Sequence, residues 1–190
     1  AAGATGAAGT NGATGAAGAV GATGAAGPTG ATGPAGTAGA RYLGEQYNGG
    51  VIYQLYIGSD GLQHGLIVNK TESTAKWQAS GTTTGANHSW DGATNTGLMT
   101  GSSAATYVAT LGAGWYLPSI DELSILWHNR YYANKALNAI GGANLLSNIT
   151  NYWSSTEYNI TNGFYFSFYN GHAYRNHKGN TFSVRAVRAF

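Results

Sequence analysis

A glycine at every third position up to Gly39, and an abrupt change of composition after it, predict a two-part fold. Residues 1–41 are expected to form a collagen-like triple helix, and residues 42–190 an α+β globular domain. The repeat takes thirteen of the chain's 31 glycines. The α+β class follows because a helical pattern lies in the middle of the second part and strand-like segments lie at its ends.

The glycine repeat has a known cause in the geometry of collagen. Three polyproline-II-like chains wind about one axis, where only a residue without a side chain fits. A flexible Gly/Ala linker, the alternative, would need no such register. At about 3.1 Å per residue, a repeat of this length would extend roughly 120 Å. The sequence therefore predicts a stalk shared by three copies of the chain, a homotrimer.

The predicted stalk is poor in stabilising residues. Proline occurs in it only at Pro28 and Pro34, and the other positions between the glycines are mostly alanine and threonine, with no charged residue before Arg41. Three such chains gain little preorganisation and no ion pairs between chains. We therefore expect residues 42–190 to hold the three chains in register as well as to bind a partner.

The composition of the last 150 residues excludes several classes of function. They contain all 23 aromatic and all 16 charged side chains, and this length suits one domain with its own core. A net charge of +2 argues against a general nucleic-acid binder. Cysteine is absent, and no apolar run has the 18 residues of a membrane span. A collagen rod of this kind favours an extracellular or cell-surface location.

The first half of the predicted domain begins with strands. Residues 49–58 mix β-branched and aromatic side chains between glycines and predict a strand, and residues 64–70 predict a second. The turn residues between them favour a hairpin. Residues 79–103, rich in Gly, Thr, Ser and Asn, predict a long loop, which a short helix over 102–111 follows.

The segment 115–132 contains the clearest helix signal. Ser119 is a candidate N-cap with Glu122 three residues later, the spacing of a capping box. An apolar stripe at helical spacing is expected to face the core, and it consists of Ile120, Leu123, Trp127 and Tyr131.

The last third alternates apolar and polar residues and predicts a three-strand meander that ends at the C-terminus. Asn170–Gly171 is a dipeptide favoured in two-residue hairpin turns, and residues 178–180 supply a second turn. By the period of two, Phe164, Phe166 and Phe168 share one face of their strand.

Several segments, in order along residues 43–190, together resemble a known family. They are GEQYNGGVIYQLY, QHGLIV, GATNTG, WYLPSIDELSIL, YWSSTEY and VRAVRAF. The chain resembles the C-terminal head domain of bacterial collagen-like surface adhesins of the Legionella type. This resemblance implies a variant of the C-type-lectin-like fold, heads that trimerise, and binding of sulfated or otherwise anionic polysaccharides.

The sequence also departs from related families. The Glu-Pro-Asn, Gln-Pro-Asp and Trp-Asn-Asp tripeptides with which sugar-binding C-type lectins hold calcium do not occur. Enzymes of the formylglycine-generating group depend on cysteines, and this chain has none. We therefore expect a protein that is not an enzyme and that has no cofactor.

Candidate ligand-binding residues lie near the C-terminus. No acidic residue follows Glu157, whereas four basic residues and two histidines do. In a trimer this excess of positive charge would be repeated three times around one axis. The predicted ligand-binding residues flank the second turn of the meander and are Tyr174, Arg175, His177 and Lys178.

Other polar residues have a structural interpretation beside the functional one. Arg185 and Arg188 are three apart on one strand and point to opposite faces, so at least one is expected to be structural, paired with Asp121 or Glu122. Oxygen ligands for a divalent cation are available at three positions, although loop carboxylates more often cap turns. The three oxygen ligands are Asp91, Asn95 and Glu157.

Trp90 and Trp153 could form a sugar platform, but tryptophans of this kind more often belong to the core.

The sequence therefore predicts an extracellular, trimeric adhesin whose head binds polysaccharides or cell-surface glycans. Two alternatives remain open. The first is the receptor-binding tip of a bacteriophage tail fibre on a virion, which would have the same architecture. The second is a structural subunit that self-associates into fibres, which the small number of charged residues permits.

Overall fold

The computed structural model describes residues 1–25, 27, 39–79 and 81–190. The chain divides into two units, Ala1–Gly36 and Thr37–Phe190. In the first unit the described residues have no helix or strand and are exposed. A Cβ placed on any glycine from Gly3 to Gly27 would meet no other atom within 4 Å. Pro28 and Pro34 lie outside the described residues.

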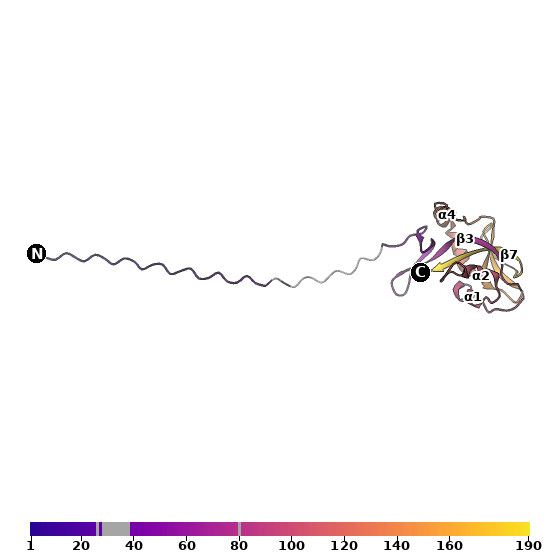
Figure 1. The fold of residues 1–190 in the computed structure, drawn as a ribbon, viewed down its shortest axis with the longest axis horizontal. Coiled ribbons are helices and arrows are strands. Elements are labelled where there is room, and N and C mark those ends of the chain that lie inside the picture. Colours follow the sequence, from indigo (N-terminus) through magenta and orange to yellow (C-terminus); the bar gives the residue numbers. More distant parts are fainter. Residues whose placement is uncertain (26, 28–38, 80) are drawn as a thin grey trace. The chain divides into compact units, whose positions relative to one another are not determined.

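In the described residues, the second unit, hereafter the head, is built on one seven-stranded sheet with the order β1-β2-β3-β7-β4-β5-β6 (Figure 1). The predicted hairpin is confirmed, because β2 and β3 pair antiparallel, although β3 is longer than expected. The strands are β1 (Gln46–Tyr47), β2 (Gly50–Ile57), β3 (Gln63–Lys76), β4 (Asn151–Glu157), β5 (Asn162–Ser167), β6 (His172–His177) and β7 (Thr181–Ala189).

The predicted C-terminal meander is wrong in its last strand. β5 and β6 form a hairpin, but β7 does not pair with β6 and instead lies between β3 and β4. It pairs antiparallel with β3, for example Val68 with Val187, and parallel with β4. The reason lies in burial: residues 184–187 are buried on both faces, as a central strand requires, whereas β6 is exposed along nearly its whole length.

The turn between β5 and β6 also differs from the prediction. Ser167 pairs with His172, so four residues connect the strands rather than two. Gly171 has φ +76°, and a Cβ there would lie 2.6 Å from the ring of Trp127. This position requires glycine for its backbone conformation and for its close approach to the tryptophan.

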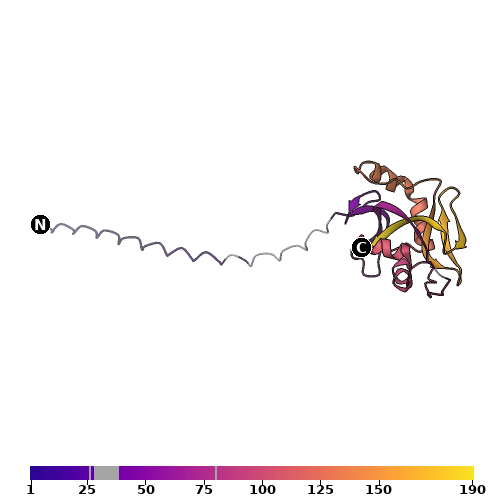
Figure 2. The ribbon, with the colours of Figure 1, turned by 45° about the vertical axis from the view of Figure 1, so that its right-hand side comes forward.

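Four helices in the described residues cover the two faces of the sheet (Figures 1 and 2). They are α1 (Gly92–Leu98), α2 (Ser103–Ala109), α3 (Ile120–His128) and α4 (Arg130–Asn138). Residues of α3 and α4 join one buried cluster with Val51, Tyr152 and Phe166, and residues of α2 join a second with Trp77 and Trp153. The head is therefore mostly β, with a core on each side of its sheet.

The helix α1 lies within the segment predicted to be a loop. Asp91 caps it, because the backbone N–H of Thr94 donates to Asp91 Oδ1 at 2.9 Å. The helix is only seven residues long and contains Gly92 and Gly97, which lowers its helical propensity. Gly92 is needed because a Cβ there would lie 2.4 Å from a carboxylate oxygen of Glu122.

The capping box of α3 is confirmed. Ser119 Oγ accepts from the backbone N–H of Glu122, and Glu122 Oε2 accepts from that of Ser119 at 2.7 Å. The predicted apolar stripe holds within α3 but fails at Tyr131, which is 67% exposed. The chain changes direction at Asn129, so Tyr131 belongs to α4 and not to the α3 stripe. In the described part of the chain, no helix has the length and apolarity that a membrane crossing requires.

Candidate functional site

Ion pairs decide which basic residues carry free charge at the surface of the head. Of the nine Lys and Arg residues, three pair with carboxylates in the described residues: Arg41 with Glu45, Lys178 with Glu157, and Arg185 with Glu72. The other six have no such partner there, and they are Lys70, Lys76, Arg130, Lys135, Arg175 and Arg188.

Lys178, one of the four predicted ligand-binding residues, is a structural residue in this fold. Its side chain is 1% exposed and its ammonium group pairs with Glu157. Nζ also donates to the carbonyl oxygen of Thr82 at 2.9 Å and lies 4.5 Å from the centre of the Trp77 ring. The charge of Lys178 is therefore used inside the head, where it fixes the loop after β3.

The carboxylate of Glu157 is fixed by several hydrogen bonds, as the ammonium group of Lys178 is. It accepts hydrogen bonds from the backbone N–H groups of Thr84 and Gly85, each at 3.0 Å, as well as from Lys178. Burial by itself raises the pKa of Glu157, but the hydrogen bonds from Lys178, Thr84 and Gly85 lower it, so that the pKa lies below the ordinary value of a glutamate. Glu157 is thus an ionised partner of Lys178 at neutral pH.

Arg185 is the second basic residue withdrawn from the surface. It is fully buried, and its Nη1 donates to Glu72 at 3.1 Å while Nη2 donates to the carbonyl oxygen of Asn144 at 2.6 Å. The expectation of a structural arginine on this strand is confirmed. Its predicted partner, Asp121 or Glu122, is wrong, because the pairing of β7 with β3 brings Glu72 opposite Arg185.

The other three predicted ligand-binding residues lie on β6 but do not face the same way. Tyr174 stacks on Tyr165, on the side of the sheet that α1 and α2 cover. Arg175 is opposite Phe164, on the side of α3 and α4, and lies 4.4 Å from the centre of the Tyr158 ring. His177 shares the side of Arg175 by the alternation of a strand. One ligand on one face cannot contact both Tyr174 and Arg175.

The three oxygen ligands considered for a divalent cation have other partners. Asp91 caps α1, and Asn95 exchanges two hydrogen bonds with the backbone of His88. Glu157 pairs with Lys178. Among the described residues no three His, Cys, Asp or Glu side chains lie close enough to hold a metal ion together. Of the two tryptophans considered for a sugar platform, Trp153 is buried and Trp90 is exposed.

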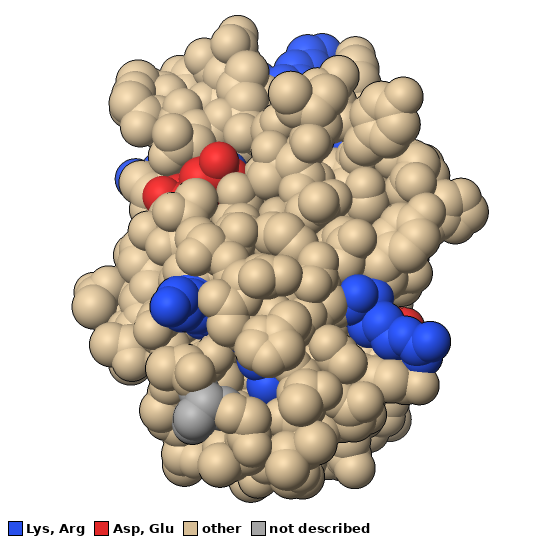
Figure 3. Space-filling model, turned by 90° about the vertical axis from the view of Figure 1, so that its right-hand side faces the viewer, with Lys and Arg blue, Asp and Glu red and all other residues tan. Residues whose placement is uncertain are grey.

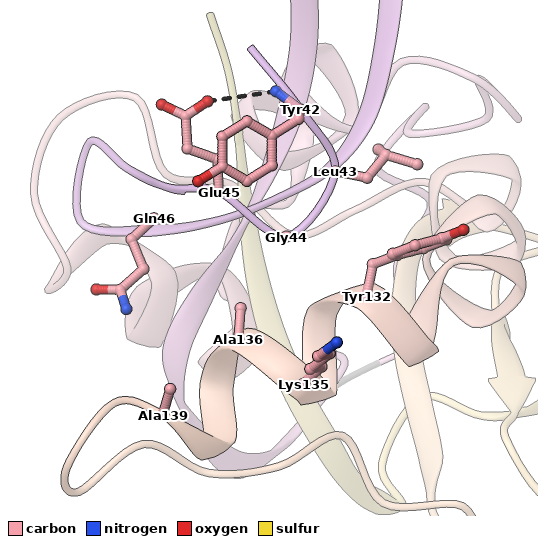
Figure 4. Close-up of a pocket in the computed structure, with 9 residues that line it drawn as sticks. All are labelled: Tyr42, Leu43, Gly44, Glu45, Gln46, Tyr132, Lys135, Ala136 and Ala139. Atoms are coloured by element: carbon pink, nitrogen blue, oxygen red, sulfur yellow. Dashed lines mark hydrogen bonds between the residues drawn. The ribbon is translucent and has the colours of Figure 1, made fainter.

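Two open grooves along α4 bring basic and aromatic side chains together. The first, of about 660 Å³, lies between residues 42–46 and α4, with Lys135 on its helical wall (Figure 4). Its other charged residue, Glu45, pairs with Arg41. The second groove, hereafter the basic groove, has a volume of about 560 Å³ and shares Lys135 with the first. It is lined by His128, Arg130, Tyr131, Asn134, Lys135 and Asn138, and by no carboxylate.

This basic groove was not predicted from the sequence, although the sequence contains a signal for it. No acidic residue lies between Glu122 and Glu157, a stretch that contains His128, Arg130 and Lys135. Figure 3 shows one face of the head, on which most atoms belong to uncharged residues and Lys and Arg appear as separate spots. Because charge is sparse, a groove with two fixed cations and a histidine is a distinctive feature.

Replacing Glu157 tests the structural role of the buried ion pair. Glu157→Ala leaves the Lys178 ammonium group buried without a counter-charge, so we expect a loss of about 3–5 kcal/mol in the free energy of unfolding. Asp60→Ala, which removes an exposed partner of His64, is the control and is expected to cost no more than about 1 kcal/mol. Urea denaturation of both variants measures the two losses.

The pH dependence of the same variants provides the second readout. Because the pKa of Glu157 is lowered in the folded head, its stabilisation is fully present at pH values above the pKa of the unfolded chain and is lost as the pH falls through the lowered pKa. The wild type should therefore lose more stability on acidification than Glu157→Ala does. Equal losses in the two proteins would show that Glu157 contributes nothing through its charge.

Comparison with known proteins gives a family and a fold. The model of the Lcl C-terminal domain matches residues 66–188. A solved structure, a fimbrial protein from Bacteroides ovatus ATCC 8483, is similar with a TM-score of 0.56 and 19% sequence identity. The match covers 69% of this chain and 37% of the fimbrial protein, so this chain spans little more than a third of that protein's length. At this identity the likeness shows the fold alone.

No sequence among curated proteins matches the chain. The family match, however, extends from β3 to β7 and covers more than half of the chain. It includes the helices and the basic groove along α4. The protein therefore belongs to the family of Lcl C-terminal domains, which confirms the resemblance found in its sequence motifs.

Proposed function

We propose that this protein is a non-enzymatic surface adhesin, carried on a collagen-like stalk, whose head binds acidic polysaccharides through the basic groove along α4. The observation that carries the proposal is the lining of that groove, in which His128, Arg130 and Lys135 face no carboxylate. A groove of one sign of charge concentrates ligands of the opposite sign. Sulfated or carboxylated sugars have that charge.

Arg130 is well suited to hold an anionic group. Its guanidinium group lies 4.2 Å from the centre of the Trp127 ring, and Nη1 donates to the carbonyl oxygen of Trp127 at 2.6 Å. These contacts limit the motion of the side chain while other N–H groups remain free to donate. A pre-oriented guanidinium group binds carboxylates and sulfates with two parallel hydrogen bonds and at a lower entropic cost.

A long acidic chain could extend from this groove to the edge of the sheet. Arg175 and His177 lie on β6 on the same side of the sheet as α3 and α4, and we include them as further contacts. This surface excludes Lys178, which is buried with Glu157, and Tyr174, which lies on the other side of the sheet. A polymer that meets several weak contacts at once binds with the avidity that a single contact lacks.

The stalk supports a trimer. Among the described residues nothing occupies the Cβ positions of the glycines from Gly3 to Gly27, so contacts within that part of the chain do not explain their regular spacing. Enclosure by two sister chains would explain it. Where the chain enters the head, an apolar groove of about 510 Å³ includes Arg41, Leu62 and Phe190, and exposed Ile57 borders it. We propose that three heads meet at this surface.

We propose that the mostly β head is a variant of the C-type-lectin-like fold, used for binding and not for catalysis. An extracellular or cell-surface location agrees with the family and with the proposed collagen-like stalk. Neither the groove nor the sheet requires a metal ion for this mode of binding.

Substituting one stalk glycine tests the trimer. In Gly15→Ser the new side chain would have to enter the crowded axis, so we expect a lower collagen-type melting temperature by circular dichroism. Ala16→Ser places the same side chain at the neighbouring outward position and is expected to melt like the wild type. If the two variants melt alike, the stalk is not a triple helix. The same conclusion would follow if the wild type lacks a cooperative melt and its mass in solution is that of one polypeptide.

Removing the charge of Lys135 tests the groove. Lys135→Gln is expected to weaken heparin binding by up to about fivefold per head, since an exposed ion pair contributes about 0.2–1 kcal/mol. The variant should leave a heparin column at lower salt than the wild type does.

The matched control is Lys76→Gln, which removes the same charge from an exposed lysine of β3 that lines neither groove along α4. It should elute close to the wild type. Equal shifts for the two variants would mean that net charge alone governs binding, and no retention of the wild type would overturn the proposal.

A further inference from the structure

An aromatic row crosses the sheet on the side of α1 and α2. Trp153 of β4 pairs with Tyr165 of β5, and Tyr165 pairs with Tyr174 of β6. The ring centres of Trp153 and Tyr165 are 6.2 Å apart, and those of Tyr165 and Tyr174 are 5.7 Å apart. The row begins fully buried at Trp153 and ends at the edge strand, where Tyr174 is 42% exposed.

The exposed end of the row is held in a fixed orientation. The Tyr174 ring lies nearly parallel to that of Tyr165, with 26° between the planes. Asn170 Nδ2 donates to the Tyr174 hydroxyl at 2.8 Å, which fixes the ring from its other end. A ring that is already oriented loses little freedom when a ligand stacks on it. An aromatic surface at this edge is therefore preorganised.

The β6 residues around the two tyrosines are polar and include a histidine. His172 and Asn176 share the face of Tyr174 by the alternation of β6. Asn180 Nδ2 donates to Asn176 Oδ1 at 2.7 Å, which joins the two amides at one margin. Arg175 points to the opposite side of the sheet, over Tyr158. Neither a carboxylate nor a lysine or arginine belongs to this face of β6.

We propose that this surface is a second binding site of the head, which takes an uncharged pyranose sugar. A pyranose ring has an apolar face of C–H groups that stacks on tyrosine, and hydroxyl groups around its edge that bond to amides. Aromatic walls with a few polar groups that fix orientation are the usual lining of small-molecule sites. The site, called the tyrosine platform below, consists of Tyr165, Tyr174, Asn170, His172, Asn176 and Asn180.

The tyrosine platform is independent of the acidic-glycan groove proposed above. The two lie on opposite sides of the sheet and use different chemistry, stacking in one and ion pairing in the other. A polysaccharide with both neutral and acidic residues could therefore occupy both. A nucleic acid fits the platform less well, because it needs cations beside the aromatic rings.

Affinity gel electrophoresis of the full chain with neutral polysaccharides tests the platform. The probes are hydroxyethyl cellulose, laminarin, mannan and galactan, each cast in a native gel. We expect at least one of them to retard the wild type, and we expect Tyr174→Ala to weaken that binding by about tenfold. Tyr174→Phe keeps the ring but loses the bond to Asn170, and it should remain within about threefold of the wild type.

The matched control is Tyr169→Ala, which removes a tyrosine that is 77% exposed and lies three residues before His172, the first residue of β6. It should migrate like the wild type in every gel. Thermal melting establishes that all variants are folded, as expected for exposed side chains. If none of the probes retards the wild type, or if Tyr174→Ala and Tyr169→Ala behave alike, the platform does not bind neutral sugars.

The neutral-polysaccharide gels and the heparin column together distinguish the two sites. Binding at the platform should persist at high salt and in Lys135→Gln, because it does not depend on ion pairs. If the protein binds neutral sugars but not heparin, the tyrosine platform is supported and the acidic-glycan groove is not. If it binds heparin but not neutral sugars, the groove is supported and the platform is not.

Discussion

The ion pair between Lys178 and Glu157 is the interaction on which the surface of the head depends. It joins the end of β4 to the turn between β6 and β7, and through Thr82 and Thr84 it holds the loop that follows β3. Burying two charges is costly unless they are paired and hydrogen-bonded, and here both are. Together with the pair of Arg185 and Glu72, this pair takes two basic residues out of the surface. Arg130 and Lys135 on α4 and Arg175 on β6 are among the basic residues without a carboxylate partner in the described residues.

The edge strand β6 divides the remaining functional groups between two sides of one sheet. Because alternate side chains of a strand point to opposite faces, Arg175 and Tyr174 are separated although they are neighbours in sequence. The side that α3 and α4 cover has Arg175 and the basic groove, and the side that α1 and α2 cover has the tyrosine platform. A single strand therefore contributes to both of the binding surfaces proposed here, one electrostatic and one aromatic.

Patterns among residues close together in the sequence were sufficient to predict much of the fold. The β2–β3 hairpin, the capping box at Ser119 and the shared face of Phe166 and Phe168 each depend on residues close together in the chain, and each is confirmed. The central place of β7 and the burial of Lys178 depend on contacts distant in sequence, because β7 pairs with β3 and Lys178 meets Glu157 only after the sheet forms. The groove along α4 was missed for a related reason: the turn at Asn129 gives α4 its own direction and turns Tyr131 to the surface.

Amine labelling of the folded chain, read by mass spectrometry with and without heparin, tests this account most directly. The chain has lysines only at Lys70, Lys76, Lys135 and Lys178, so each can be followed separately. The account predicts that Lys178 is unreactive in both states, and that heparin protects Lys135 but not Lys76. Labelling of Lys178 as fast as Lys76, or no protection of Lys135 by bound heparin, would contradict it.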